Sequence, residues 1–174
     1  MAVESYEKLM GDLKKLRLPA MTEMLDSYVK QAASNSMSYM DFLSGLVSEE
    51  VRYKEQRAVQ SRIKSARFPV LKSLDDFDYA FQPSINRKKL AELSSLRFID
   101  NKENILFLGP PGIGKTHLST GLGVRACESG YKVLFITLND MVSVLMASMA
   151  DNSFPTKLRQ FVQPSLLIVD EVGY

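Results

Sequence analysis

The chain has 174 residues, of which 45% are hydrophobic and 24% are charged, and its net charge at pH 7 is only +2. This is the composition of an ordinary folded protein of one domain or two small ones. The single cysteine, Cys127, excludes an internal disulfide, and no apolar stretch has the length of a membrane span or the pattern of a signal peptide. We therefore expect a cytoplasmic protein that does not associate with membranes.

The first part of the chain has the apolar periodicity of helices. Residues such as Leu9 and Leu13 recur at helical spacing, and Pro19 separates this helix from a second one. A third helix follows and becomes basic toward its end. We therefore predict a small all-α N-terminal domain over residues 1–67 and a second domain over residues 68–174.

After residue 104 the pattern changes to strands alternating with helices. Apolar runs at 105–108, 133–136 and 166–169 predict buried strands, and a brief helix is expected at 86–96. Alternation of this kind indicates parallel strands with right-handed crossovers, so the second domain is predicted to be α/β, with a parallel sheet between layers of helices. The helix at 138–149 is expected to place three methionines, Met141, Met146 and Met149, in the core, and an adaptable surface for a partner is the alternative.

The first predicted strand leads directly into a glycine-rich loop. Its sequence, GPPGIGKT, fits the Walker A pattern of P-loop NTPases, G-x-x-x-x-G-K-[ST], and it stands between a strand and a helix as that motif requires. Backbone N–H groups of such a loop bind the phosphates of ATP. Lys115 is expected to reach the β- and γ-phosphates, Thr116 to bind Mg²⁺, and His117 to lie near the nucleotide. The loop residues are Gly109, Pro110, Pro111, Gly112, Ile113, Gly114, Lys115 and Thr116.

Two carboxylates follow the last apolar strand. Asp170 and Glu171 stand at its carboxyl end, where ligands of parallel sheets bind. Asp170 is expected to contact Mg²⁺ through water, and Glu171 to orient and polarise the water that attacks the γ-phosphate. The predicted catalytic residues are therefore Lys115 and Glu171. Binding of ATP without hydrolysis is the alternative interpretation.

Three segments together resemble one family of P-loop proteins. They are the loop GPPGIGKTHL, the strand end DEVGY and the connector ARFP-x-x-K-x-L-x-x-FD at residues 66–78. These segments are similar to those of the IstB family of insertion-sequence helper ATPases, which are AAA+ proteins related to the DnaC-type helicase loaders. The resemblance covers essentially the whole chain. It implies a homo-oligomer that uses ATP and Mg²⁺, binds duplex DNA without sequence specificity, and assists a transposase in choosing its target.

The resemblance also gives roles to two further sets of side chains. In AAA+ relatives the segment before the first strand packs around adenine, so Phe68, Pro69 and Phe77 are candidates for a base pocket. Packing of these residues onto the sheet is the other interpretation. The basic part of the third helix could contact DNA phosphates, although a solvated charged helix would explain it as well. The candidates for DNA contact are Arg52, Lys54, Arg57, Arg62, Lys64 and Arg67.

The AAA+ fold has the strand order 5-1-4-3-2, and only three of these strands are recognisable before the chain ends at Tyr174. We therefore expect a truncated member of the family, in which strand 105–108 lacks both neighbours. Hydrolysis is expected to be weak because the arginine finger is missing. Two other functions stay open: a DnaC-like helicase loader, and an interaction module whose ATPase part is inert.

Overall fold

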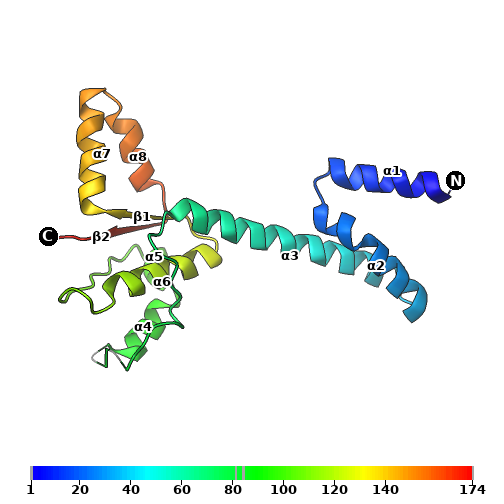
Figure 1. The fold of residues 1–174 in the computed structure, drawn as a ribbon, viewed down its shortest axis with the longest axis horizontal. Helices are drawn as coiled ribbons and strands as arrows, with labels where there is room; N and C mark the ends of the chain where they lie inside the picture. The colour runs from blue at the N-terminus through cyan, green and yellow to red at the C-terminus, as the bar shows by residue number, and fades with distance from the viewer. Residues whose placement is uncertain (1, 81, 84, 174) are drawn as a thin grey trace. The chain divides into compact units, whose positions relative to one another are not determined.

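The computed structural model describes residues 2–80, 82–83 and 85–173, and the chain divides into two units, Met1–Ala58 and Val59–Tyr174. The boundary between the units falls inside the long helix α3, Tyr39–Ala66 (Figure 1). In the described ranges, no helix is both long enough and apolar enough to cross a membrane.

The described part of the first unit consists of helices packed around a small core. Helix α1 is Ala2–Lys15 and helix α2 is Pro19–Asn35, so the predicted break before Pro19 is confirmed. Proline suits the start of a helix, where its missing N–H would have no partner in any case. One leucine from each of the three helices is no more than 6% exposed, and these residues form the core: Leu13, Leu25 and Leu46.

A buried carboxylate joins α3 to the start of α2. Glu50 is 4% exposed, and its Oε2 accepts a hydrogen bond of 3.1 Å from the backbone N–H of Met21. That N–H belongs to the first turn of α2, where helix N–H groups have no partner within the helix. The Nζ of Lys54 lies 3.8 Å from the other oxygen of the same carboxylate. Glu50 therefore caps α2 from another helix.

The described residues of the second unit form a two-stranded parallel sheet. Strand β1 is Val133–Thr137 and strand β2 is Leu166–Asp170, and the register runs from Val133 beside Leu166 to Thr137 beside Asp170. Both strands lie where the sequence predicts them. Helices α7, Leu138–Ala150, and α8, Phe154–Val162, form the crossover between the strands, and α7 contacts both β1 and α8.

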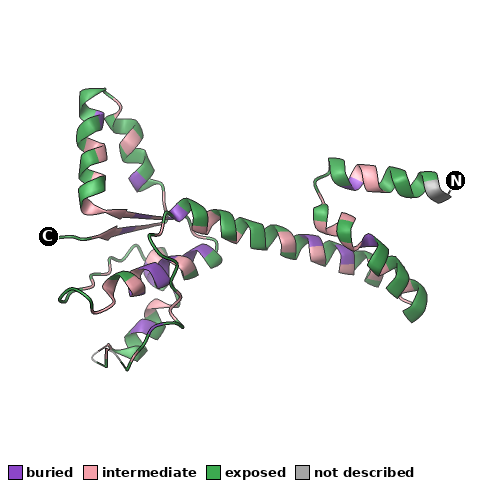
Figure 2. Cartoon of the chain, viewed as in Figure 1, coloured by how far each residue is buried: buried purple, intermediate pink, exposed green. Residues whose placement is uncertain are grey.

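Helix α6, Lys115–Glu128, packs against both strands and is buried along much of its length (Figure 2). Two glycines let other segments approach it closely. A Cβ at Gly123 would lie 2.7 Å from the ring of Phe68, and a Cβ at Gly121 would lie 2.7 Å from the side chain of Leu74. The connector that follows α3 therefore packs directly onto α6.

Residues 105–108 do not form a strand, so the prediction of a strand in this segment was wrong. Ile105 and Phe107 are partly buried beside the cores of the second unit, whereas Leu106 and Leu108 are 81% and 84% exposed. In the part of the chain that the structure describes, no strand pairs with this segment. A strand requires a neighbour for its backbone N–H and C=O groups, and apolar side chains cannot replace it. The predicted three-layer parallel sheet therefore contains two strands here.

Two short helices precede this segment. Helix α4, Arg87–Leu93, begins after Asn86, whose side chain accepts a hydrogen bond of 3.1 Å from the backbone N–H of Lys89. It lies within the helix predicted at 86–96. Helix α5, Arg97–Asp100, is only four residues long and follows a left-handed residue, Leu96, with φ of 62°. Periodicity over four residues cannot reveal a helix, so the sequence did not predict α5.

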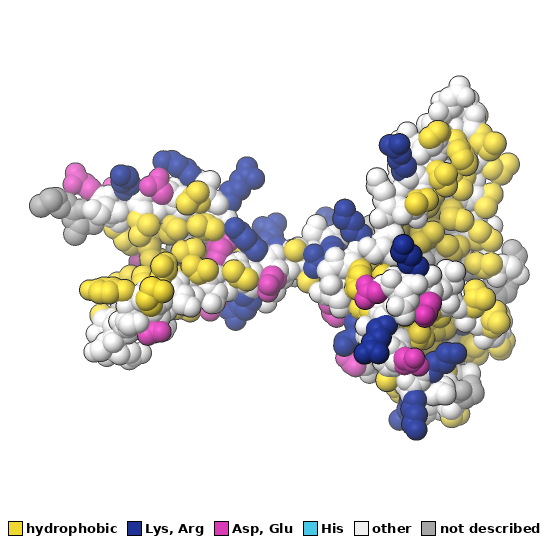
Figure 3. Space-filling view, turned by 180° about the vertical axis from the view of Figure 1, so that it is seen from behind, with side chains coloured by type: hydrophobic (Ala, Val, Ile, Leu, Met, Phe, Trp, Pro, Cys, Tyr) yellow, Lys and Arg dark blue, Asp and Glu magenta, His cyan; other side chains and the backbone are white. Residues whose placement is uncertain are grey.

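Two of the three methionines of α7 were wrongly expected in the core, while Met141 is half-buried. Met146 and Met149 are 66% and 68% exposed, and Val142 beside them is 43% exposed. Figure 3 shows hydrophobic side chains gathered on this part of the second unit. The described part of α7 therefore presents an apolar side to solvent.

Candidate functional site

The glycine-rich loop of residues 109–116 leads from the 105–108 segment into α6. Gly114 precedes the helix and has a left-handed φ of 91°. A Cβ at this position would also lie 2.7 Å from the ring of Phe77, so both the backbone conformation and the available space require glycine. The first N–H groups of α6 have no partners within the helix and lie at the positive end of its dipole. Such a helix start is suited to binding an anion.

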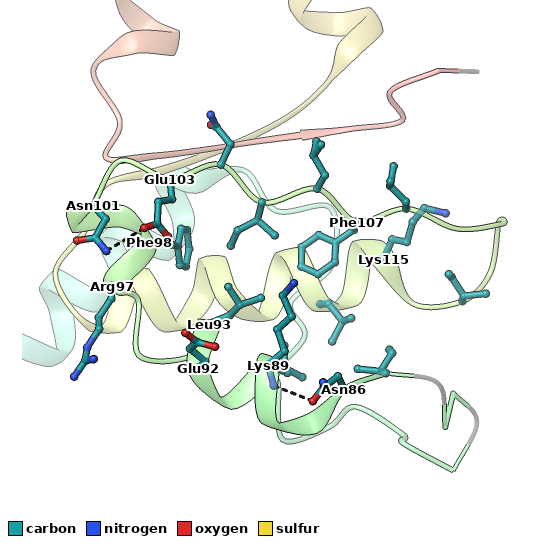
Figure 4. Close-up of a pocket in the computed structure, with 18 residues that line it drawn as sticks. Asn86, Lys89, Glu92, Leu93, Arg97, Phe98, Asn101, Glu103, Phe107 and Lys115 are labelled. Carbon is teal, nitrogen blue, oxygen red and sulfur yellow. Dashed lines mark hydrogen bonds between the residues drawn. The ribbon is translucent and has the colours of Figure 1, made fainter.

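Lys115 places a positive charge over this loop. Its Nζ donates hydrogen bonds of 2.8 Å to the backbone oxygens of Gly109 and of Pro110. Figure 4 shows the side chain directed along the loop. The ammonium group is therefore held at the first two residues of the loop, and the loop as a whole combines this charge with the positive end of the α6 dipole.

The structure brings together the two residues that were predicted to hold a metal ion. Thr116 Oγ1 donates a hydrogen bond of 2.8 Å to Asp170 Oδ2, although 54 residues separate them in the sequence. The other oxygen of Asp170 accepts a hydrogen bond of 3.0 Å from the backbone N–H of Glu171. Hydroxyl and carboxylate oxygens are ligands that Mg²⁺ prefers. Across residues 2–80, 82–83 and 85–173, no group of three or more His, Cys, Asp or Glu residues could hold a metal ion.

Glu171 lies at the end of β2 in an unusual backbone conformation. Its φ is 58°, in the left-handed region that residues other than glycine seldom adopt, and its side chain is exposed. Strain of this kind costs about 1–3 kcal/mol and is concentrated at functional sites. The side chain of Glu171 is therefore open to solvent directly after Asp170, which contacts Thr116 of the loop.

Phe77 and His117 fasten the connector to the base of the loop. Phe77 is 7% exposed, and its ring centroid lies 5.2 Å from that of His117 in an edge-to-face arrangement. His117 Nε2 donates a hydrogen bond of 2.8 Å to the carbonyl oxygen of Ser73. Both side chains thus support the loop from the connector side. The contact between His117 and Ser73 could not be predicted from sequence motifs, because the two residues belong to segments far apart in the chain.

Phe68 occupies a different place from Phe77. Its ring packs edge-to-face on Phe135 of β1, with 6.4 Å between the ring centroids, and fits against Gly123 of α6. It is one of the partly buried residues around the main core of the second unit. This geometry favours packing onto the sheet over a base pocket for Phe68, whereas Phe77 lies directly against the loop.

A cavity of about 710 Å³ borders the loop on the side of α4. Lys89 extends into it from α4, Phe107 faces it from the opposite wall, and Lys115 stands at the end next to the loop (Figure 4). Phe68 and Phe77 do not line it. All four residues of segment 105–108, which pairs with no strand among the described residues, line it.

Comparison with known proteins identifies the family. The chain matches the family described as IstB-like ATP binding protein over residues 11–174. It belongs to this IstB-like family. The chain is 44% identical over 160 residues to a protein of Geobacillus stearothermophilus named as an ATP-binding protein of insertion sequence IS5376, and the match covers 92% of this chain and 64% of that protein.

Two further relatives carry names of the same kind. The protein named for insertion sequence IS21 of Pseudomonas aeruginosa is 40% identical, over 93% of this chain and 61% of its own length. The protein named for IS232 of Bacillus thuringiensis subsp. berliner is 37% identical, over 98% of this chain and 68% of its own length. The chain thus spans about two thirds of the length of these curated relatives. The resemblance to the IstB family that the sequence motifs indicated is confirmed.

The basic residues that the sequence proposed for DNA contact lie on α3 and just beyond its end, and several of them have partners within this IstB-like chain. The partners are Glu49 for Arg52, Glu50 for Lys54, Tyr53 for Arg57, and the carbonyl oxygen of Cys127 for Arg62. The last contact is 2.7 Å long and is made by Arg62 Nε at the end of α6. Arg62 therefore stabilises the fold as well as carrying a charge. Periodicity did not reveal this role.

Cys127 is fully buried beneath the same contact. Burial raises the pKa of its thiol, an effect that the nearby Arg62 partly opposes. The thiol therefore stays protonated near neutral pH, where only the thiolate is a good nucleophile. This agrees with a structural rather than a chemical role.

Proposed function

We propose that this chain binds ATP at residues 109–116 and Mg²⁺ through Thr116 and Asp170. The hydrogen bond of 2.8 Å between Thr116 and Asp170 carries the proposal, because it joins the loop to the acidic end of β2. Lys115 and the start of α6 supply the positive charge that phosphates require. The family, described as ATP binding proteins, supports the choice of nucleotide.

Different residues of the site would bind the phosphates, bind the metal ion and activate water. Backbone N–H groups of the loop and Lys115 would hold the phosphates, and Thr116 and Asp170 would hold Mg²⁺. The metal ion would neutralise negative charge on the phosphates. Glu171, whose side chain is exposed next to Asp170, would orient and polarise a water molecule as a general base.

The wider proposal is an AAA+ helper protein of an insertion sequence. It would form a homo-oligomer, bind duplex DNA without sequence specificity, and assist a transposase in selecting target DNA. The names of the relatives support the link to insertion sequences. Strands β1 and β2 correspond to the second and third strands of the AAA+ order 5-1-4-3-2, which are neighbours there. The direct pairing of β1 with β2 supports this part of the proposal.

Nucleotide binding is tested by titrating the chain with a fluorescent ATP analogue and Mg²⁺. We expect Lys115→Ala and Asp170→Ala each to weaken binding at least about tenfold, the effect of losing one charged contact of about 1.4 kcal/mol. Lys88→Ala is the matched control, because it removes an exposed lysine outside the loop and should leave the affinity unchanged. Equal binding by all four proteins would contradict the proposed site.

The partner is tested by copurification with a transposase and, in parallel, with a replicative helicase. Capture of the transposase alone supports the insertion-sequence helper, and capture of the helicase alone supports the helicase loader instead. An interaction module with an inert ATPase part would retain DNA or a protein partner in the Lys115→Ala variant and would show no ATP turnover that depends on Glu171.

A further inference from the structure

A concave surface of the second unit lies away from the glycine-rich loop and has no role in the site described above. It has a volume of about 730 Å³ and is bordered by the end of α3, by β1 and by the segment from the end of α8 toward β2. None of residues 109–116 lines it, nor do Asp170 and Glu171. We refer to it as the β1 groove.

The charged residues of the β1 groove all have the same sign. Arg62, Arg67 and Lys132 line it, and no aspartate or glutamate is among its described lining residues. By contrast, the cavity beside the loop is lined by carboxylates as well as by cations. The groove also offers neutral hydrogen-bonding side chains, which are Ser61, Ser65, Gln160 and Gln163.

The floor of the groove is packed, and one of its three cations is fixed by a hydrogen bond. Val133 and Phe161, which line the groove, are 6% and 8% exposed and belong to the packed interior. The Nε of Arg62 donates to the Cys127 carbonyl at 2.7 Å, which fixes one side of its guanidinium group. Its terminal nitrogens are not used by that bond. A guanidinium fixed in this way loses little side-chain entropy when it binds an anion.

From this combination we propose that the β1 groove binds the sugar-phosphate backbone of duplex DNA. Phosphate oxygens are recognised by arginine, lysine, serine and glutamine side chains together, which is the set of donors that the groove presents. The inference rests on the proposed function, which requires DNA binding. The inference adds Lys132, Gln160 and Gln163 to the candidates for DNA contact. Of the basic residues that the sequence proposed, it assigns only Arg62 and Arg67 to this groove.

The experiment uses the whole chain and a 40-base-pair duplex of arbitrary sequence, with affinity measured by fluorescence anisotropy at several salt concentrations. The double variant Arg67→Gln/Lys132→Gln removes two charges and leaves Arg62 in place, because Arg62 also holds α6. The slope of log affinity against log salt concentration falls in magnitude by about 1 for each lost phosphate contact. The slope of the double variant should therefore be smaller in magnitude than that of the wild type by about 2. The control double variant, Lys88→Gln/Lys102→Gln, removes two exposed charges outside the groove and should keep the wild-type slope.

The outcomes separate the inference from the function on which it rests. If the wild-type chain binds the duplex and both double variants keep its slope, the groove is not the contact surface and the inference is overturned, while DNA binding stands. If the wild-type chain does not bind the duplex, both fail, and the nucleotide titration still tests the ATP site. If polyglutamate of equal charge displaces the duplex at equal concentration, the groove recognises acidic chains in general and the inference is again overturned.

Discussion

Gly114 and Phe77 form a contact on which the shape of the glycine-rich loop depends. Phe77 comes from the connector, and its ring occupies the space in which a side chain at Gly114 would have to lie. The loop is therefore held by an aromatic residue outside the Walker A motif. This is a second explanation for an aromatic residue at position 77, beside the adenine contact that the family resemblance implied.

Gly114→Ala should destabilise the second unit by about 2–4 kcal/mol, since it combines a left-handed φ with overpacking against Phe77. Gly112→Ala is the matched control. It has a left-handed φ of 82° but no atom within 4 Å of the added Cβ, so it should cost only about 1–2 kcal/mol. Urea unfolding of both variants measures the difference. Equal destabilisation would show that Phe77 yields freely to a side chain at position 114.

Helices were predicted from sequence better than strands, and the reason is the range of the interactions involved. The apolar periodicity and Pro19 predicted α1 and α2, and the pattern of the residues after the loop predicted α6. These helices were predictable because the backbone hydrogen bonds of a helix lie within its own segment. The run at 105–108 is as apolar as β2, yet only β2 has a neighbouring strand among the described residues. Apolar character predicts burial, but it does not supply a partner for the backbone.

In the candidate site, too, the local features were predictable from sequence and the contacts between distant segments were not. The Walker A spacing identified a loop before a helix, and the acidic pair identified the end of a strand. Contacts between distant segments were not visible in the sequence: His117 with Ser73, Arg62 with the Cys127 carbonyl, and Phe77 with Gly114. Each depends on how the connector and α3 pack on α6, and no short motif records that packing.

The alternating exposure of residues 105–108 can be tested by charge substitution. Leu106→Lys should change the free energy of unfolding by no more than about 0.5 kcal/mol, because its side chain is already in solvent. Phe107→Lys should cost about 2 kcal/mol or more, because this side chain packs beside Leu118 and Phe77. Thermal denaturation followed by circular dichroism compares them. A large loss for Leu106→Lys would mean that another strand or a second copy covers this face in solution.

The cap that Glu50 provides makes α2 depend on α3. Glu50→Ala should destabilise the first unit by about 1–3 kcal/mol, because it leaves the Met21 N–H without its buried acceptor. Glu50→Gln should recover part of this loss, since its amide oxygen can accept the same bond. Glu55→Ala, an exposed position on α3, is the control. The prediction fails if Glu50→Ala and Glu55→Ala have the same midpoint in urea.

At the scale of the whole chain, the described buried residues form separate cores. The core of Leu13, Leu25 and Leu46 lies in the first unit, while the clusters around Phe135 and around Phe77 lie in the second. Among the residues whose burial the structure describes, none belongs to a core of each unit. The free energy of folding is therefore expected to divide between the units, although α3 contributes residues to each.

Amide hydrogen exchange tests this division. Leu13→Ala should cost about 2–5 kcal/mol in the first unit and speed exchange in α1 and α2, while β1 and β2 keep their protection. Phe135→Ala should have the opposite pattern, since its ring packs in the core of the second unit. Faster exchange in every element of both variants would show that the chain unfolds as a single cooperative body.

The burial of Cys127 has a practical consequence for measuring distances in this protein. It is the only cysteine in the chain and has no exposed surface. Cysteines introduced at exposed positions, such as Glu7→Cys in the first unit and Lys88→Cys in the second, would therefore be the sites that a maleimide dye could reach under native conditions. Donor and acceptor dyes can be attached without first replacing the native cysteine, and fluorescence energy transfer between them would measure the spacing of the two units in solution.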